Sequence, residues 1–339
     1  MSIHLVIPGL VWPAATVADL TRGLALPALQ VLLGHARVSA APAMTLESWL
    51  GQAFGLSPEA LPHAALRRLG EADRATIDGE WLCADPVHLH FARERLLLAD
   101  ASELAITAEE SAALIQRLNE FLAEAEPGLG RFEAGSPERW YLHLAEPARA
   151  RFAALDEVVG RPMAHFLPEG EDARRWQRLV SEAQILLHDH PVNRAREAAG
   201  ARTVNSLWLW GGGRAPAHLT APARTIQAQE PFARGLARAA GVEAGPPRAL
   251  PGEDALVVLD ALHRPALHLD IERWQHALQG LETQWFAPLL AALKARRTSA
   301  LRITAPGDRT TLDLSLDARS LWKFWRRPRS LDSLNATLP

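Results

Sequence analysis

The chain has 339 residues, and its 36 basic and 39 acidic side chains give a formal charge of −3 at pH 7. Apolar residues make up 48% of the chain and charged residues 22%, which allows a large core and excludes global disorder. The near-zero net charge argues against a general nucleic-acid-binding protein. No apolar stretch approaches the roughly 18 residues of a membrane helix, so we expect no membrane segment.

Cysteine use and the first residues bear on the compartment. Cys83 is the only cysteine, which excludes a disulfide framework and a cysteine-rich zinc site. The first apolar run has no Lys or Arg before it and is interrupted by Pro8, a pattern that argues against a secretory signal. We therefore expect a cytoplasmic protein.

The N-terminal part is predicted to be mostly helical after one strand. The run from His4 to Gly9 is typical of a short buried strand that ends in Pro-Gly. Helical spacing and start signals then predict three helices, over Leu20–Leu33, Thr45–Phe54 and Ser57–Leu69.

The next part, Trp81 to Pro147, has the pattern of a small α+β subdomain. Two strand-like runs precede a helix that starts at the capping box of Thr107 and Glu110, and two more strands follow. The four strands are predicted at 86–91, 94–99, 131–134 and 139–144. We predict an inserted α+β subdomain over 81–147, within an α/β core formed by 1–80 and 148–339.

The remainder alternates between helices and strands, which predicts a mostly parallel sheet flanked by helices. The expected helices cover 172–188, 233–240 and 274–294. The expected strands cover 204–210, 255–259, 266–269, 300–304 and 311–314.

A glycine-rich turn is the densest candidate for a binding site. The strand Val204–Trp210 runs into Gly211, Gly212 and Gly213, and Arg214 follows. Glycines let backbone N–H groups approach a phosphate closely, and the arginine is a suitable anion partner. The spacing matches neither a dinucleotide-binding fingerprint nor a Walker A loop. A flexible turn after a buried strand is the alternative.

Two clusters of histidines and acids are candidate metal ligands. His188 and His190 flank Asp189, and on an extended segment both imidazoles could face one ion. The second cluster comprises His268, Asp270, Glu272 and His276. Neither offers a complete ligand set nearby, and the chain has no Gly-x-Ser-x-Gly nucleophile motif. Arg139 either faces a phosphate or points outward beside core aromatics.

The motifs after His188 resemble the archaeal-type cofactor-independent phosphoglycerate mutases. The matching residues are His190-Pro191-Val192-Asn193, Arg196, Gly200, Asn205, Trp208, Trp210, Gly211, Gly213, Arg214 and Pro216. The segment from Thr107 to Asn119, with Arg139 after it, is similar to that family's inserted subdomain. As a whole, the chain resembles more closely the bacterial RpfE-type regulatory proteins, a mutase-like branch. We expect ligand contacts from His188, His190, Asn193, Asn205, Trp208, Trp210, Gly211, Gly213, Arg214 and Arg139.

The resemblance implies an alkaline-phosphatase-like fold, two divalent metals such as Mn²⁺ or Mg²⁺, and a Ser or Thr nucleophile. The implied metal ligands are missing. The first strand ends in Pro8-Gly9 where the family has Asp-Gly, and Ala305-Pro306-Gly307 stands where the family has Asp-His. One histidine can be aligned within 268–276, but the accompanying Asp is gone, and no final His occurs among 317–329. The nucleophile window offers only Thr45 and Ser48.

These losses favour a degenerate mutase-like protein that has no metal cofactor, is not an enzyme, and binds a small anionic or phosphorylated ligand or a protein partner. The runner-up is a metal-dependent mutase or phosphatase. A third hypothesis is an interaction scaffold whose contact surface is the aromatic and basic C-terminal end, formed by Trp322, Phe324, Trp325, Arg326 and Arg327. Nucleic acid and membrane are not expected as partners.

Overall fold

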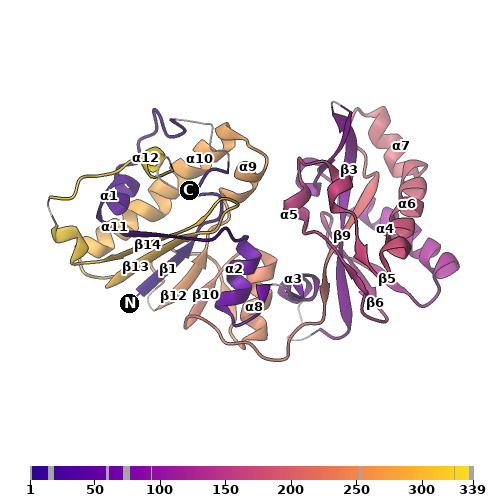
Figure 1. The fold of residues 1–339 in the computed structure, drawn as a ribbon, viewed down its shortest axis with the longest axis horizontal. Coiled ribbons are helices and arrows are strands. Elements are labelled where there is room, and N and C mark those ends of the chain that lie inside the picture. Colours follow the sequence, from indigo (N-terminus) through magenta and orange to yellow (C-terminus); the bar gives the residue numbers. More distant parts are fainter. Residues whose placement is uncertain are drawn as a thin grey trace. The chain divides into compact units, whose positions relative to one another are not determined.

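The computed structural model describes residues 2–13, 19–58, 61–71, 77–92, 94–251, 254–323 and 325–335. The chain forms two compact units (Figure 1). Met1–Glu59 and His218–Pro339 form one, the α/β unit, and Ala60–Ala217 form the other, the insert unit. The insert unit thus extends beyond the predicted 81–147 on both sides.

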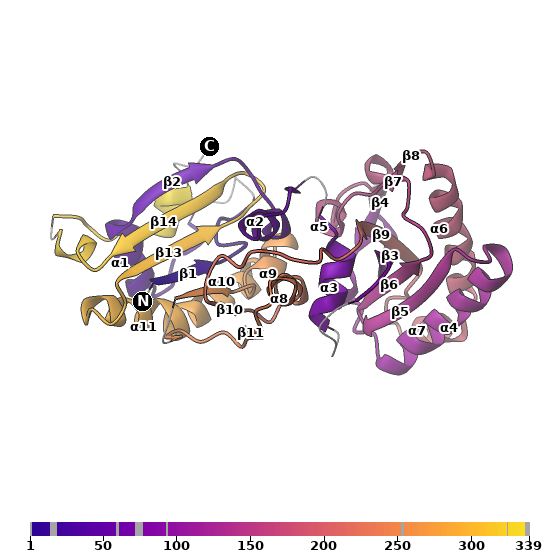
Figure 2. The same cartoon turned by 90° about the horizontal axis from the view of Figure 1, so that it is seen from below.

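The α/β unit contains a seven-stranded sheet in the order β11-β10-β12-β1-β13-β14-β2 (Figure 2). The first five strands are parallel, and β14 and β2 are antiparallel to their neighbours. The predicted mostly parallel sheet is therefore confirmed. The bounds are β1 Ser2–Val6, β2 Arg37–Ala41, β10 Thr225–Gln227, β11 Ala244–Gly245, β12 Ala255–Val258, β13 Ala300–Ala305 and β14 Thr311–Asp317.

Helices cover both faces of this sheet (Figure 1). Ile3 and Leu5 of β1 join a large apolar core with the first group of helices. His4 points to the other face, where its ring meets Trp49 of α2 edge-on at 5.3 Å. The first group comprises α1 Pro27–His35, α9 His263–Leu267, α10 Ile271–Leu281, α11 Ala287–Lys294 and α12 Leu331–Asn335, and the second α2 Leu46–Ala53 and α8 Pro231–Ala239.

Two predicted elements of the α/β unit differ in the structure. The helix expected from Leu20 begins only at Pro27, where Glu282 accepts hydrogen bonds from the N–H groups of Ala28 and Leu29 at 2.6 and 3.0 Å. The strand expected at 266–269 is wrong, because these residues continue α9 and the turn after it. A short apolar run does not by itself distinguish a strand from one helical turn.

The insert unit is built on an antiparallel sheet. Its order is β4-β3-β6-β5, with β9 also paired to β3. The strand predicted at 204–210 is therefore present, but it belongs to this sheet and not to the parallel one. The bounds are β3 Glu80–Ala92, β4 Arg95–Ala99, β5 Gly130–Ser136, β6 Arg139–Leu144 and β9 Ser206–Gly213.

The helices of the insert unit lie unequally on the two faces of its sheet. One face is packed by α4 Ala108–Ala125 and α6 Ala173–His188 over an apolar core, with α7 Pro191–Ala198 beside them. The other face carries α3, His63–Glu71. The small elements are α5 Leu155–Val158 and the pair β7 Ala150–Arg151 and β8 Glu169–Gly170. Within the described residues, no helix is both long and apolar enough to cross a bilayer.

Candidate functional site

The face of the insert sheet under α3 is polar and aromatic, which sets it apart from the opposite face. Leu82 and Ala84 of β3 belong to the apolar core. Their neighbours Cys83 and Asp85 point the other way, toward α3, because side chains alternate along a strand. Register places Cys83 between Tyr141 of β6 and Trp210 of β9.

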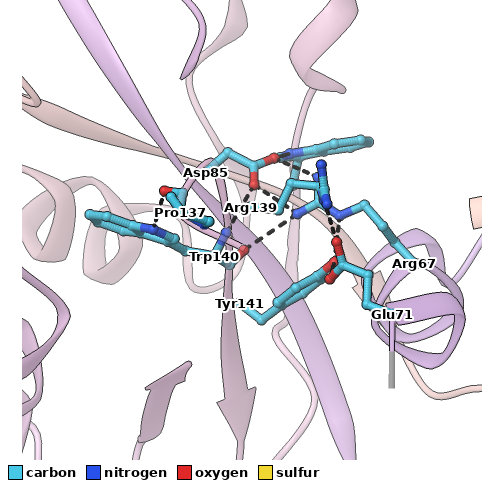
Figure 3. Close-up of polar contacts among 8 residues, drawn as sticks. Arg67, Glu71, Asp85, Pro137, Arg139, Trp140 and Tyr141 are labelled. Atoms are coloured by element: carbon cyan, nitrogen blue, oxygen red, sulfur yellow. Dashed lines mark hydrogen bonds and ion pairs between the residues drawn. The ribbon is translucent and has the colours of Figure 1, made fainter. Parts of the chain in front are cut away.

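A buried ion pair forms the centre of this face (Figure 3). Arg67 of α3 donates to both carboxylate oxygens of Asp85, at 2.9 and 2.7 Å, and its Nε donates to the hydroxyl of Tyr141 at 2.9 Å. Asp85 also accepts from the backbone N–H of Trp140 and from Nε1 of Trp210, at 3.3 and 2.8 Å. Arg67 and Asp85 are both buried, so each charge depends on the other and on these hydrogen bonds.

The network reaches the surface through a second pair of charges. The Tyr141 hydroxyl donates to Glu71 of α3 at 2.7 Å, and Arg139 forms an ion pair with the same carboxylate. Figure 3 shows the head groups of Arg139 and Arg67 close together beside this carboxylate. The Arg139 side chain is 36% exposed. Arg139 is therefore the arginine of the network that is most accessible to a ligand from solvent.

Arg68 forms a second outer pair. Its Nη2 lies 3.4 Å from Glu133 of β5, and its guanidinium lies 5.7 Å from the ring of Trp81. Its Nε is buried without a hydrogen-bond partner among the described residues. We call the whole set the α3 network: Arg67, Arg68, Glu71, Asp85, Glu133, Arg139, Tyr141 and Trp210.

Burial keeps the other titratable groups of this face neutral. Desolvation raises the pKa of Cys83 and of Tyr141 well above their ordinary values. Desolvation, together with the nearby charge of Arg67, holds the pKa of His63 well below its usual range. None of these three groups can therefore exchange a proton near pH 7. These three groups are suited to structural support and not to acid–base chemistry at neutral pH.

The glycine turn predicted to bind phosphate packs against α3. Gly211 and Gly213 have φ of +65° and +142°, and a Cβ there would lie 2.8 Å from the Cβ of His63 and 2.9 Å from that of Pro62. Close approach of the helix start therefore accounts for both glycines. Arg214 pairs with Glu80 at 3.1 Å, and its side chain is 66% exposed.

The predicted asparagines hold strands and loops together. Asn193 donates to the carbonyls of Leu187 and Val204, at 2.7 and 2.8 Å, and accepts from the N–H of Val204 at 2.9 Å. Asn205 bonds both backbone groups of Leu89, at 2.7 and 2.9 Å. The side-chain amides of both asparagines thus bond backbone N–H and C=O groups in the way a neighbouring strand does.

Trp208 and the two histidines lie outside the α3 network. Nε1 of Trp208 donates to the carbonyl of Ala153 at 3.0 Å. The predicted extended His-x-His segment is wrong, because His188 is the last residue of α6 and His190 is the N-cap of α7. His190 accepts from the N–H of Val192 through Nδ1 at 3.2 Å. Of the ten predicted ligand residues, the structure brings only Trp210 and Arg139 into the network.

The charged centre of the network was not predicted from the sequence. Arg67, Glu71 and Asp85 carry no motif, and their pairing depends on α3 lying over β3. A weak signal existed: Asp85 interrupts an otherwise apolar run, and Tyr141 is the only tyrosine in the chain. Each is a residue type that needs a partner once buried.

Open α/β sheets usually bind ligands at the carboxyl ends of their parallel strands, so this edge of the α/β unit is the other candidate site. The backbone after β1 passes through Gly9, where a Cβ would lie 2.5 Å from the carbonyl oxygen of Leu262. After β10, Glu230 caps α8 by accepting from the N–H groups of Phe232 and Ala233, both at 2.7 Å. Burial, with the nearby Glu47 and Asp260, raises the pKa of Glu230 to about 7.

The donors at this edge do not fit a pair of divalent metals. Ligand atoms of Glu47 and His263 lie within 4.8 Å of one another. No third His, Cys, Asp or Glu of the α/β unit joins them at that distance among the residues that the structure describes. Thr45 and Ser48, the candidate nucleophiles, bond to each other at 3.1 Å, and Thr45 caps α2. A two-metal centre needs several donors around each ion.

The sequence is similar to known proteins mainly in the insert unit. A family model described as 2,3-bisphosphoglycerate-independent phosphoglycerate mutase matches residues 87–193. A protein of that name from Methanothrix thermoacetophila is 34% identical over 120 residues, which is 35% of this chain and 29% of the relative. A probable one from Geobacter sulfurreducens is 30% identical over 138 residues, 38% of this chain and 32% of the relative. The matches thus span about a third of these relatives.

The fold is shared over a longer stretch. The structure of the PH0037 protein from Pyrococcus horikoshii matches 98% of this chain and 91% of that one, with a TM-score of 0.58 and 15% identity. The sheet order confirms the predicted mostly parallel sheet flanked by helices, and this likeness shows that a solved structure shares the fold. The chain is therefore similar in sequence to the phosphoglycerate mutases within its insert unit, and similar in fold over nearly its whole length to the PH0037 protein.

Proposed function

We propose that this chain is a degenerate relative of the cofactor-independent phosphoglycerate mutases, without their two-metal chemistry, and that it acts as an RpfE-type regulatory protein in the cytoplasm. The observation that carries the proposal is the donor set at the carboxyl edge of the α/β sheet. Two metals must be held close together across a transferring phosphoryl group. Pro8-Gly9 after β1 and Pro306-Gly307 after β13 offer no carboxylate or imidazole for this purpose.

One of the carboxylates at that edge, Glu230, is already in use. Glu230 bonds two backbone N–H groups at the start of α8, and its raised pKa means that the carboxyl group is partly protonated at neutral pH. A protonated, capping carboxyl group is a poor metal ligand. The insert unit, by contrast, retains the region similar in sequence to the mutases.

The proposed ligand is a small anionic or phosphorylated molecule bound at the outer edge of the α3 network. Nε of Arg139 pairs with Glu71, which leaves the terminal nitrogens of this partly exposed guanidinium to contact a phosphate. The six charges of the network, three arginines and three acids, balance. A ligand must therefore be recognised by the fork geometry of Arg139 more than by overall charge.

Metal content tests the loss of catalysis. The protein is purified with Mn²⁺ and Mg²⁺ present and desalted, and its metals are measured by elemental analysis. We expect no stoichiometric metal and no interconversion of phosphoglycerates. About two tightly held ions per chain, with mutase activity, would establish the runner-up, a metal-dependent mutase in which Glu47 and His263 are the first ligands to examine.

Calorimetric titration with inorganic phosphate and with 3-phosphoglycerate tests the ligand site. Arg139→Ala is expected to weaken binding about tenfold or more, because a charge-assisted hydrogen bond is lost. Arg151→Ala is the matched control, since Arg151 is also paired with a glutamate on the insert unit but lies outside the network. Equal affinities in the wild type and Arg139→Ala would contradict this site.

A further inference from the structure

The segment after β14 presents two exposed tryptophans. The side chains of Trp322 and Trp325 are 69% and 67% exposed; Phe324, between them, lies outside the described residues. Both belong to the aromatic and basic C-terminal end of the chain, and neither takes part in the proposed ligand site. Large apolar side chains gathered on a surface are typical of interaction sites.

This segment is anchored firmly to α1. Nη1 of Arg326 donates to the carbonyls of His35 and Ala36, at 3.0 and 2.9 Å, and so satisfies the end of the helix. Nδ1 of His35 lies 3.0 Å from the carbonyl oxygen of Ser320. A Cβ on Gly34 would lie 2.2 Å from the carbonyl oxygen of Arg327. The backbone on both sides of the tryptophans is thus fixed, which lowers the entropy cost of binding.

Four cations, Arg296, Arg297, Lys323 and Arg327, lie in the turn after α11 and in the segment that carries the tryptophans. The guanidinium of Arg296, in the turn after α11, lies 5.4 Å from the ring centre of Trp322. Figures 1 and 2 both show the end of α11 beside the segment that follows β14. Among the described residues, no carboxylate pairs with the four cations of this surface. We call it the basic tryptophan surface: Arg296, Arg297, Trp322, Lys323, Trp325 and Arg327.

We propose that the basic tryptophan surface binds an acidic segment of a partner protein. Carboxylates of the partner pair with these four cations, which have no carboxylate partner among the described residues and stand out on a chain whose formal charge is −3. Apolar side chains of the partner pack on the tryptophans. Trp and Arg are the residue types that contribute most to binding energy at protein interfaces. This proposal is independent of the ligand at Arg139.

Two other anionic partners fit the surface less well. A base of single-stranded nucleic acid stacks on a free aromatic face, but the Arg296 guanidinium lies over the Trp322 ring. A membrane surface calls for an amphipathic helix with a broad apolar side, whereas this segment contains only the 3₁₀ turn Ser320–Trp322. We therefore assign the surface to a protein.

Fluorescence anisotropy of the full chain tests the proposal. The probe is a short fluorescein-labelled peptide in which acidic residues alternate with leucine. We expect binding that weakens with salt, and the double variant Trp322→Ala/Trp325→Ala should bind about tenfold more weakly. Phe91→Ala is the control, because Phe91 is an aromatic side chain of the insert unit that is 79% exposed. It should leave the affinity unchanged.

Arg296→Gln/Arg297→Gln should weaken peptide binding and flatten its salt dependence, since each lost cation removes a screened attraction. All four substituted side chains lie at the surface, and unchanged melting temperatures confirm that the variants fold. The proposal is overturned if the peptide does not bind, or if the tryptophan variant binds it as tightly as the wild type. Tighter binding to oligothymidylate or to phosphatidylglycerol vesicles than to the peptide would also overturn it.

Discussion

Asp85 is the residue on which the α3 network depends most. It accepts hydrogen bonds from Arg67, from the backbone of Trp140 and from Trp210, and it is 2% exposed. Removing one partner of a buried ion pair leaves the other charge without compensation, which costs about 3–5 kcal/mol. We therefore expect Asp85→Ala to lower the free energy of unfolding by about that amount in urea titrations followed by circular dichroism.

A matched substitution separates this effect from the general cost of losing an acid. Glu169 pairs with Arg151 on the same unit, but both side chains are exposed. Glu169→Ala should change the free energy of unfolding by less than about 1 kcal/mol. Similar losses in the two variants would show that the buried pair has no special role.

The reactivity of the Cys83 thiol gives a second test of how α3 covers this face. The thiol is fully buried, and desolvation raises its pKa well above the ordinary value. Because the thiolate is the reactive form, we expect Cys83 to resist a disulfide reagent in the native protein and to react in urea. Asp85→Ala should speed the native-state reaction. Fast labelling of the native wild type would mean that α3 does not cover Cys83 in solution.

At the scale of elements, two groups on the α/β sheet give stability opposite pH dependences. Burial and Arg302 lower the pKa of His4 to about 4, and its Nε2 lies 2.8 Å from Thr304. The stability that the neutral His4 side chain contributes is therefore lost as the pH falls from 6.5 toward 4. The Glu230 cap has a pKa raised from 4.5 to about 7, so its contribution is full at low pH and is lost as the pH rises through 7.

Glu230→Gln isolates the second effect. Glutamine keeps an acceptor oxygen for the start of α8 but cannot ionise. Because one of the two N–H groups loses its acceptor, we expect the variant to be about 1 kcal/mol less stable than the wild type near pH 4.5, and the difference to shift in its favour by about 3 kcal/mol by pH 8. The measurement is a series of urea titrations between these pH values. A difference that does not grow with pH would show that Glu230 titrates normally.

The sequence predicts a feature well when the residues that determine it are neighbours in the chain, and poorly when they come from different elements. The helix from Thr107 was predicted because its capping box lies within four residues, and the structure confirms it in α4. The apolar run at 204–210 predicts the strand β9 but does not indicate its neighbour, so the prediction placed β9 in the parallel sheet and not beside β3. The pairing of Arg67 with Asp85 joins two elements, and no local pattern indicates it. The glycines of the turn and a helix over Ser57–Leu69 were both predicted, but the packing of that helix on the glycines was not.

At the scale of the molecule, the two units carry different parts of the resemblance. The whole matched stretch, 87–193, lies within the insert unit. The α/β unit keeps the parallel sheet, and Pro-Gly follows the carboxyl ends of both β1 and β13. A fold can be kept when the side chains of a site change, because the fold depends on the pattern of apolar core residues and the site depends on a few side chains.

The two units should also unfold separately. Their apolar cores share no residue: one is built on β1, β13, α1 and α10, the other on β3, β6, α4 and α6. Units with separate cores commonly melt as separate cooperative transitions. In scanning calorimetry we expect Asp85→Ala to lower the transition of the insert unit alone. Glu282→Ala should lower the transition of the α/β unit alone, because Glu282 is buried and caps α1.

Native-state hydrogen exchange assigns each transition to its unit. Amides of β3 and β6 should lose protection in Asp85→Ala, while those of β1 and β13 keep it, and Glu282→Ala should give the reverse. A single transition that both variants shift equally would mean that the units are coupled as strongly as parts of one core. Separate transitions would mean that ligand binding on the insert unit can stabilise that unit alone, since a ligand stabilises only the structure that holds its site.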